Sequence, residues 1–352
     1  AVGRSDESAG LDSLFRLANN DSKLKSRIVE KLKDFSVRLV LTAHPTQFYP
    51  GPVLGIINDL IEAIKVNDIS NINLLLQQLG KTPFIKKQKP TPVDEAISLA
   101  WYLENVFYKV TSGIHFKIDD ELDVEGEDVK QLIELGFWPG GDRDGNPNVT
   151  VESTKRVASM LRTILFRCYY RDFRIVKRRI TFSGIEQYLD TLQHLFYENS
   201  FNPIANPKDD TAEILTNLVA IKKVLNEVHN GLFVELVEDL IHKVNTFGCY
   251  FANLDIRQDS SILRNTTAYL VGKYPVETGM KPQDLTAAED AKQAALQFSE
   301  ATLDFEDNTD ALIQDTIGVI RQLKDIQASG SERAAQRFII SNCQQASDIL
   351  SL

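Results

Sequence analysis

The sequence has few of the residues that build disulfide-rich, turn-rich or membrane-spanning proteins. Its 352 residues include only three cysteines. They lie far apart without a CxxC pair, which excludes a disulfide framework and a zinc knuckle and fits a reducing compartment. Glycine (18) and proline (12) are both below average usage, which favours helices over a turn-rich all-β fold. With no run of about 18 apolar residues and no apolar leader in the polar N-terminus, we expect no membrane span and a cytoplasmic protein.

Positive charge is also scarce. Lysine and arginine total 39 against 49 aspartates and glutamates, a net charge of −10, which disfavours a nucleic-acid partner because phosphate binding depends on clustered cations. Acids crowd the stretch from Asp119 to Asp128. We interpret it as a solvated loop or helix edge, with a calcium site as the alternative, although the D-x-D-x-D-G spacing is absent. The basic residues between Arg174 and Arg179 are interpreted as favourable charge at a helix C-terminus, with an anion site as the alternative.

The hydrophobic periodicity predicts a mainly α protein with a small parallel β component. Apolar residues at helical spacing predict helices over 10–35, 53–80, 94–110, 151–180, 212–228 and 309–327, with another helix beginning in 344–351. Short apolar runs predict strands near 37–41, 136–139, 251–256 and 338–341. Helical connections between these strands imply parallel pairing. No repeat of 20 to 50 residues is visible, which disfavours a solenoid.

His44 is the first candidate site residue. It follows the first predicted strand within the sequence TAHPT. Ligands of parallel α/β folds bind at the carboxyl ends of the strands, and an imidazole can exchange a proton near neutral pH. The alternative is a structural histidine that donates to a nearby carbonyl.

The second candidate is the glycine-rich stretch GFWPGGDRDGNPN, residues 136–148. Its glycines let the backbone approach another group closely. Arg143 is suited to bind an oxyanion through two hydrogen bonds while a flanking aspartate, such as Asp142, orients it. The alternative is a turn closed by local side-chain hydrogen bonds. The stretch is neither a GxGxxG nor a Walker A motif, so it does not indicate a nucleotide.

Arg257 is the third candidate, directly after the third predicted strand in LDIRQDS. A forked cation in this position suits a phosphate or a carboxylate, and the alternative is an ion pair with Asp255 or Asp259. Parallel strands would bring all three candidates to one edge of the sheet. An imidazole beside two guanidinium groups describes a site for a small, anionic, oxygen-rich substrate.

Taken together, these motifs resemble those of phosphoenolpyruvate carboxylase. The matching stretches are LVLTAHPTQ (39–47), PTPVDEA (90–96), GGDRDGNPNVT (140–150), NLDIRQDSS (253–261) and, more loosely, FIISNCQQASDIL (338–350). The resemblance implies a partial (β/α)₈ TIM-type barrel, with about four of eight strands, surrounded by long helices. Residues 1–352 would then form the N-terminal part of a single large domain, without a separate second domain.

The resemblance also implies an activity. Family members carboxylate phosphoenolpyruvate with bicarbonate through carboxyphosphate and an enolate, and the oxaloacetate that they release supplies the tricarboxylic acid cycle. His44 would be catalytic, Arg257 would contact the substrate phosphate, and Arg143 and Asp142 would belong to the substrate site. The family uses Mg²⁺ or Mn²⁺, whose ligands lie in later segments, so we expect the 352-residue chain alone to be inactive. The full-length protein is expected to be a homo-oligomer, a tetramer by resemblance.

The chain departs from the family pattern at one place. Plant and many bacterial members carry two adjacent arginines where this chain has Pro50 and Gly51, and plant members carry a basic residue at Asn148. These differences argue against a sugar-phosphate activator site. The alternative to an enzyme is a non-catalytic helical scaffold or interaction module that keeps the motifs by descent.

Overall fold

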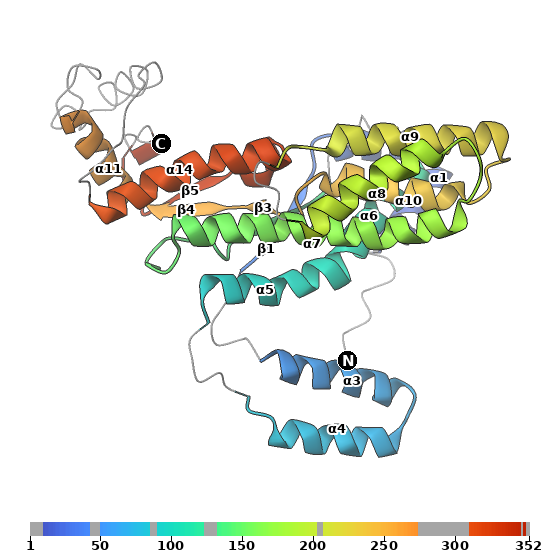
Figure 1. The fold of residues 1–352 in the computed structure, drawn as a ribbon, viewed down its shortest axis with the longest axis horizontal. Coiled ribbons are helices and arrows are strands. Elements are labelled where there is room, and N and C mark those ends of the chain that lie inside the picture. The colour runs from blue at the N-terminus through green and yellow to red at the C-terminus, as the bar shows by residue number, and fades with distance from the viewer. Residues whose placement is uncertain are drawn as a thin grey trace.

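The computed structural model describes residues 10–42, 50–84, 90–122, 132–202, 207–273, 310–345 and 348–349. Long helices surround a few short parallel strands (Figure 1), which confirms the predicted mainly helical architecture. The helices are α1 (Leu11–Asn20), α2 (Ser22–Leu32), α3 (Gly51–Lys65), α4 (Ile69–Lys81), α5 (Pro92–Tyr102), the π-helical turn η2 (Leu103–Phe107), α6 (Tyr108–Leu122), α7 (Val151–Arg179), α8 (Glu186–Phe201), α9 (Thr211–Val228), α10 (Val234–Phe247), α11 (Ser260–Lys273), α14 (Ala311–Gly330) and the 3₁₀ turn η4 (Glu332–Ala335). None of the helices in these segments combines the length and apolar character that a membrane crossing requires.

The strands form two small parallel sheets, and the chain passes directly from the last strand of the first sheet into the second. β1 (Val37–Leu41), β2 (Ile133–Phe137) and β3 (Asn253–Leu254) make the first sheet in that order, and β4 (Ile256–Asp259) pairs with β5 (Phe338–Ser341) in the second. Only Asp255 separates β3 from β4, so one extended segment contacts both β2 and β5. All the pairings are parallel, as predicted from the helical connections between strands.

Two strand boundaries differ from the predicted ones. β1 and the strand at 338–341 lie where the sequence predicts them, whereas β2 covers Ile133–Phe137 rather than 136–139. Pro139 lies in a tight turn, in which the amides of Gly141 and Asp142 donate to the carbonyl of Trp138, and the ladder hydrogen bonds of β2 lie before it. The predicted strand at 251–256 is split at Asp255 and continues to Asp259.

Several predicted helices are divided in the structure. The helix predicted over 10–35 is interrupted at Asp21, whose carboxylate accepts hydrogen bonds from the amides of Lys23 and Leu24 and thereby caps α2. The helix predicted over 53–80 is two helices with a turn at Asn67, where φ is 55°. By contrast, α7, α9 and α14 lie within a few residues of their predicted ranges.

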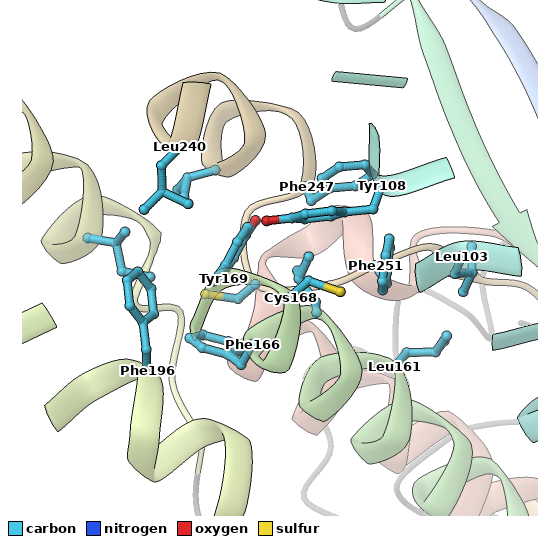
Figure 2. Close-up of a cluster of buried hydrophobic side chains, with 14 of the residues drawn as sticks. Leu103, Tyr108, Leu161, Phe166, Cys168, Tyr169, Phe196, Leu240, Phe247 and Phe251 are labelled. Carbon is cyan, nitrogen blue, oxygen red and sulfur yellow. The ribbon is translucent and has the colours of Figure 1, made fainter. Parts of the chain in front are cut away.

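The main core lies between α7, α8, α10 and the strands. Tyr108 stacks on Phe247 with ring centroids 5.8 Å apart, and Phe166 and Tyr169 of α7 complete an aromatic cluster (Figure 2). Burial of side chains this large is the main favourable term in folding. Because α7 supplies much of this core and begins directly after the glycine-rich loop, the core fixes one end of that loop.

Candidate functional site

The side chain of Arg257 meets two aspartates of the glycine-rich loop. Its Nη1 lies 3.2 Å from both carboxylate oxygens of Asp142, and its Nη2 pairs with Asp144. The backbone holds the two segments together as well, since the amide of Arg257 donates to the carbonyl of Gly141 (2.9 Å) and the amide of Arg143 donates to the carbonyl of Arg257 (2.8 Å). The structure therefore brings two of the predicted site segments, 115 residues apart, into direct contact.

Trp138 forms a platform for this guanidinium group. The Cζ of Arg257 lies 5.4 Å from the centroid of the Trp138 ring, a cation–π contact. The indole is fixed from the other side, because its Nε1–H donates to the carboxylate of Asp255 at 3.1 Å. Asp255 is only 2% exposed and also pairs with Arg38 of β1. A buried carboxylate is tolerated when it is paired and hydrogen-bonded, so this network holds both the indole and, through it, Arg257.

Two glycines of the loop are required by close contacts. A Cβ on Gly141 would lie 2.0 Å from the carbonyl oxygen of Asp255, and a Cβ on Gly140 would meet the side chain of Val157. Gly140 and Gly145 also have positive φ angles of 81° and 67°, which favour glycine. The prediction that glycines allow a close approach is confirmed for Gly140 and Gly141, whereas a Cβ on Gly145 would meet nothing within 4 Å.

Arg143 faces away from Arg257, toward α14. It is 6% exposed, and its Nη2 pairs with Asp315 of α14, whose other oxygen accepts a hydrogen bond of 3.0 Å from the amide of Val151. Asp315 therefore joins the loop to the N-terminus of α7, where a negative charge is favourable. The prediction that a flanking aspartate orients Arg143 is wrong, because Asp142 and Asp144 hold Arg257 instead. Within the described residues, Nε and Nη1 of Arg143 have no hydrogen-bond partner.

A cavity of about 230 Å³ opens beside the two aspartates. Pro90, Pro92 and Glu95 line one side of it, and Trp138, Asp142, Asp144 and neighbouring loop residues line the other. The motif at 90–96 thus lies next to the glycine-rich loop. Thr91 and Asp94 cap the start of α5 through reciprocal hydrogen bonds, which fixes this side of the cavity.

The remaining predicted residues are placed only in part. His44 lies outside the described residues, but β1 leads toward it, and the carbonyl of Leu41 accepts a hydrogen bond of 3.0 Å from the amide of Trp138. Pro50 precedes α3, and Asn148 is exposed on the rim of the cavity. Most of the acidic stretch between Asp119 and Asp128 also lies outside the described residues.

Three residues support Arg257 in ways that the sequence motifs did not predict. The sequence suggested Asp255 only as a direct partner of Arg257, whereas Asp255 acts on Arg257 through Trp138. Arg38 carried a usable signal, because a lone arginine inside an apolar strand needs a charged partner when it is buried. Trp138 lay within a quoted motif without being singled out.

A divalent cation would need a group of carboxylate or imidazole ligands. Nowhere in the described segments do three or more His, Cys, Asp or Glu side chains gather in such a group. Asp142 and Asp144, the acids nearest the cavity, are held by Arg257. These residues alone do not fit a metal site, so no chemical step is assigned to a metal here.

Comparison with known proteins points to the same family as the sequence motifs. The sequence profile of phosphoenolpyruvate carboxylase matches residues 3–205 and 193–352. The phosphoenolpyruvate carboxylase of Psychromonas ingrahamii is 25% identical over 398 residues, which cover 97% of this chain and 43% of the relative. That of Aliivibrio salmonicida is 25% identical over 393 residues, covering 98% and 44%. Phosphoenolpyruvate carboxylase 1 of Chlamydomonas reinhardtii is 31% identical over 175 residues, covering 45% and 18%.

The chain spans less than half the length of these curated relatives. The profile match nevertheless runs through nearly all of its residues, including the segments that meet at Arg257. The chain belongs to the phosphoenolpyruvate carboxylase family.

Proposed function

We propose that this chain forms the phosphate-binding side of a phosphoenolpyruvate carboxylase active site, and that the full-length protein carboxylates phosphoenolpyruvate with bicarbonate to oxaloacetate and phosphate. The observation that carries the proposal is the meeting of Arg257 with the loop aspartates above Trp138, beside a cavity. Arg257 is 28% exposed at its side chain, and within the described residues its Nε takes no partner. It is therefore held in place while keeping a donor for a phosphate oxygen.

His44 is proposed as the proton-handling residue. It follows Leu41 by three residues, which span at most about 10 Å of extended chain. Because the carbonyl of Leu41 is bonded to the amide of Trp138, this reach includes the neighbourhood of Arg257. There a neutral imidazole can take the proton from the carboxyl group of carboxyphosphate as CO₂ is released, and the imidazolium can then pair with the phosphate.

Arg143 and Asp142 have different proposed roles. Asp142 orients Arg257 for the substrate through the 3.2 Å contacts. Arg143 is proposed to act on the substrate site from its buried position, where its positive charge adds to the field of the loop. The proposed cofactor is Mg²⁺ or Mn²⁺, the proposed location is cytoplasmic, and the proposed assembly is a homotetramer of full-length chains.

The partial barrel is proposed as the scaffold of this site. The parallel order β1, β2, β3 with β4, and β5, each separated by helices, supports it, because this is how consecutive strands of such a barrel are arranged. In this arrangement the 352 residues form the N-terminal part of one large domain.

Calorimetric titration of the chain with phosphoenolpyruvate tests the substrate site. Arg257→Ala should weaken binding by about 10-fold or more, because a hydrogen bond to a charged group contributes about 1.5–3 kcal/mol. Arg337→Ala is the matched control, since Arg337 precedes β5 and pairs with Glu134 at the opposite end of the strands. Equal binding by both variants would refute the assignment of Arg257.

Turnover is tested separately by coupling oxaloacetate production to malate dehydrogenase. The 352-residue chain alone is expected to show none, because a developing enolate needs stabilisation by a metal cation, and the described residues gather no group of three or more metal-ligating side chains. In the full-length protein, His44→Ala should abolish carboxylation without unfolding the chain. A non-catalytic scaffold would instead show no oxaloacetate from the full-length protein either.

A further inference from the structure

Four arginines lie in one row along α7. Arg167, Arg171, Arg174 and Arg178 follow one another at spacings of four, three and four residues, which places them on the same side of the helix, and all four are exposed. We call these four residues the arginine face. At 1.5 Å per residue it is about 16 Å long.

The helix itself does not explain the arginine face. The field of a helix C-terminus favours cations only within about the last turn. This accounts for Arg178 at the end of α7, but Arg167, Arg171 and Arg174 lie one to three turns earlier. Like charges at these spacings repel one another and destabilise a helix. The interpretation of the basic residues as favourable charge at a helix end therefore covers only part of the row.

The charges of the arginine face are poorly neutralised by the chain. Arg171 pairs with Glu104 at 3.2 Å, and the Nε of Arg167 donates to the carbonyl of Ser200 at 3.2 Å. Arg174 and Arg178 have no carboxylate partner within the described residues. This is notable in a chain with ten more acidic than basic residues, where carboxylates are plentiful.

A groove with an apolar floor runs beside the arginine face. It has a volume of about 510 Å³, and besides the four arginines it is lined by Tyr170, Ile175, Arg179 and Phe201. Tyr170 packs edge-on against Phe201 at 5.6 Å, and Phe201 and Ile175 are each 52% exposed. Arginine together with aromatic side chains is the composition enriched at protein–protein interfaces.

We propose that the arginine face and its groove bind an acidic segment of a protein partner. The segment is extended, about five residues long to match about 16 Å at 3.3 Å per residue. Its carboxylates pair with Arg174 and Arg178, and an apolar side chain between them rests on Phe201 and Ile175. A lone phosphate would find no enclosed donors in this open groove, and the net charge of −10 repels a long polyanion such as RNA.

Fluorescence anisotropy with a labelled peptide, Glu-Asp-Phe-Glu-Asp, tests the proposal. The double variant R174E/R178E should weaken binding at least 10-fold, and raising the salt concentration should weaken binding to the parent chain. The double variant K155E/R156E is the control, because it changes the charge of two exposed basic residues on the same helix by the same amount. It should change the affinity by less than about twofold, since it leaves the arginine face intact. Circular dichroism should show equal folding of all three proteins, and R174Q/R178Q replaces R174E/R178E if that variant unfolds.

Four results would overturn the proposal. These are no binding of the peptide, an equal loss in both double variants, unchanged affinity when the phenylalanine of the peptide is replaced by serine, and tighter binding of an RNA oligonucleotide or of phosphatidylserine vesicles than of the peptide. The first two exclude a specific site, the third excludes the apolar anchor, and the last assigns the face to a different class of partner.

Discussion

At the scale of single residues, His115 joins α6 to the first residue of β2. Its Nε2 accepts a hydrogen bond of 3.2 Å from the amide of Ile133, and its Nδ1 lies 3.3 Å from the hydroxyl of Thr246. Burial, together with the charge of the nearby His242, lowers the pKa of His115 to about 4. The folded chain therefore holds the imidazole neutral, the form that can accept from Ile133.

This arrangement predicts a pH-dependent contribution to stability. Because the pKa is depressed in the folded state, the stabilisation is complete above the unfolded value of about 6.5 and is lost as the pH falls toward 4. The free energy of unfolding of the parent, minus that of His115→Gln, should fall by up to about 3 kcal/mol between pH 7 and pH 4 in urea titrations. The corresponding difference in unfolding free energy for His194→Gln, at a histidine whose side chain is 80% exposed, should not change over this pH range. A flat difference for His115→Gln would contradict the prediction.

In the candidate site, individual residues could be predicted from the sequence, but the contacts between them could not. Arg257 and Asp142 were predicted because each lies in a motif beside a strand end. Their pairing was not, because the weighed partners of Arg257 were its chain neighbours, whereas the aspartates that hold it are more than 100 residues away. Long-range ion pairs depend on which strand lies next to which, and this information is absent from local spacing.

At the scale of elements, the helices and strands with the strongest local sequence patterns were predicted best. α7 was predicted almost to its ends, because it has a long 3.6-residue period. In the structure, Thr150 and Ser153 also cap its start through reciprocal hydrogen bonds. α8 was not assigned, although Leu189, Leu192 and Phe196 carry the same spacing. β2 was misplaced because its position depends on pairing with β1 along Val37–Leu41, a tertiary effect that overrides local preference.

The junction of α7, α14 and the glycine-rich loop depends on Asp315. Replacing it by alanine removes the acceptor for the amide of Val151 and leaves the buried Arg143 without its ion-pair partner. Loss of one member of a buried pair costs about 3–5 kcal/mol, so Asp315→Ala should lower the free energy of unfolding by a few kcal/mol. Asp325→Ala, at an exposed aspartate of the same helix, should cost less than about 0.5 kcal/mol. Similar losses in urea titrations of the two variants would show that Asp315 does not hold the junction.

At the scale of the whole molecule, the site is assembled from distant parts of the chain. β1, β2 and β3 stand side by side in one parallel sheet. Long helices such as α7 lie alongside it, whereas α3 and α4 form a hairpin that projects away from it (Figure 1). This order brings the segment after β2 and the first residues of β4 to one edge, where Trp138, Asp142 and Arg257 meet. The same order leaves β1 at the other side of the sheet without a further strand in the described part of the chain.

That free edge predicts self-association. Val37, Leu39 and Val40 of β1 are each about 40% exposed, and an apolar edge strand with unpaired backbone groups pairs readily with another chain. The 352-residue chain should therefore sediment as dimers or larger species in analytical ultracentrifugation. Val40→Lys should shift it toward monomer, because a lysine on an edge strand opposes pairing. Val228→Lys, the same change at a more exposed valine at the end of α9, should leave the association unchanged. A monomeric parent chain, or equal dissociation by both substitutions, would show that β1 is not the surface through which copies meet.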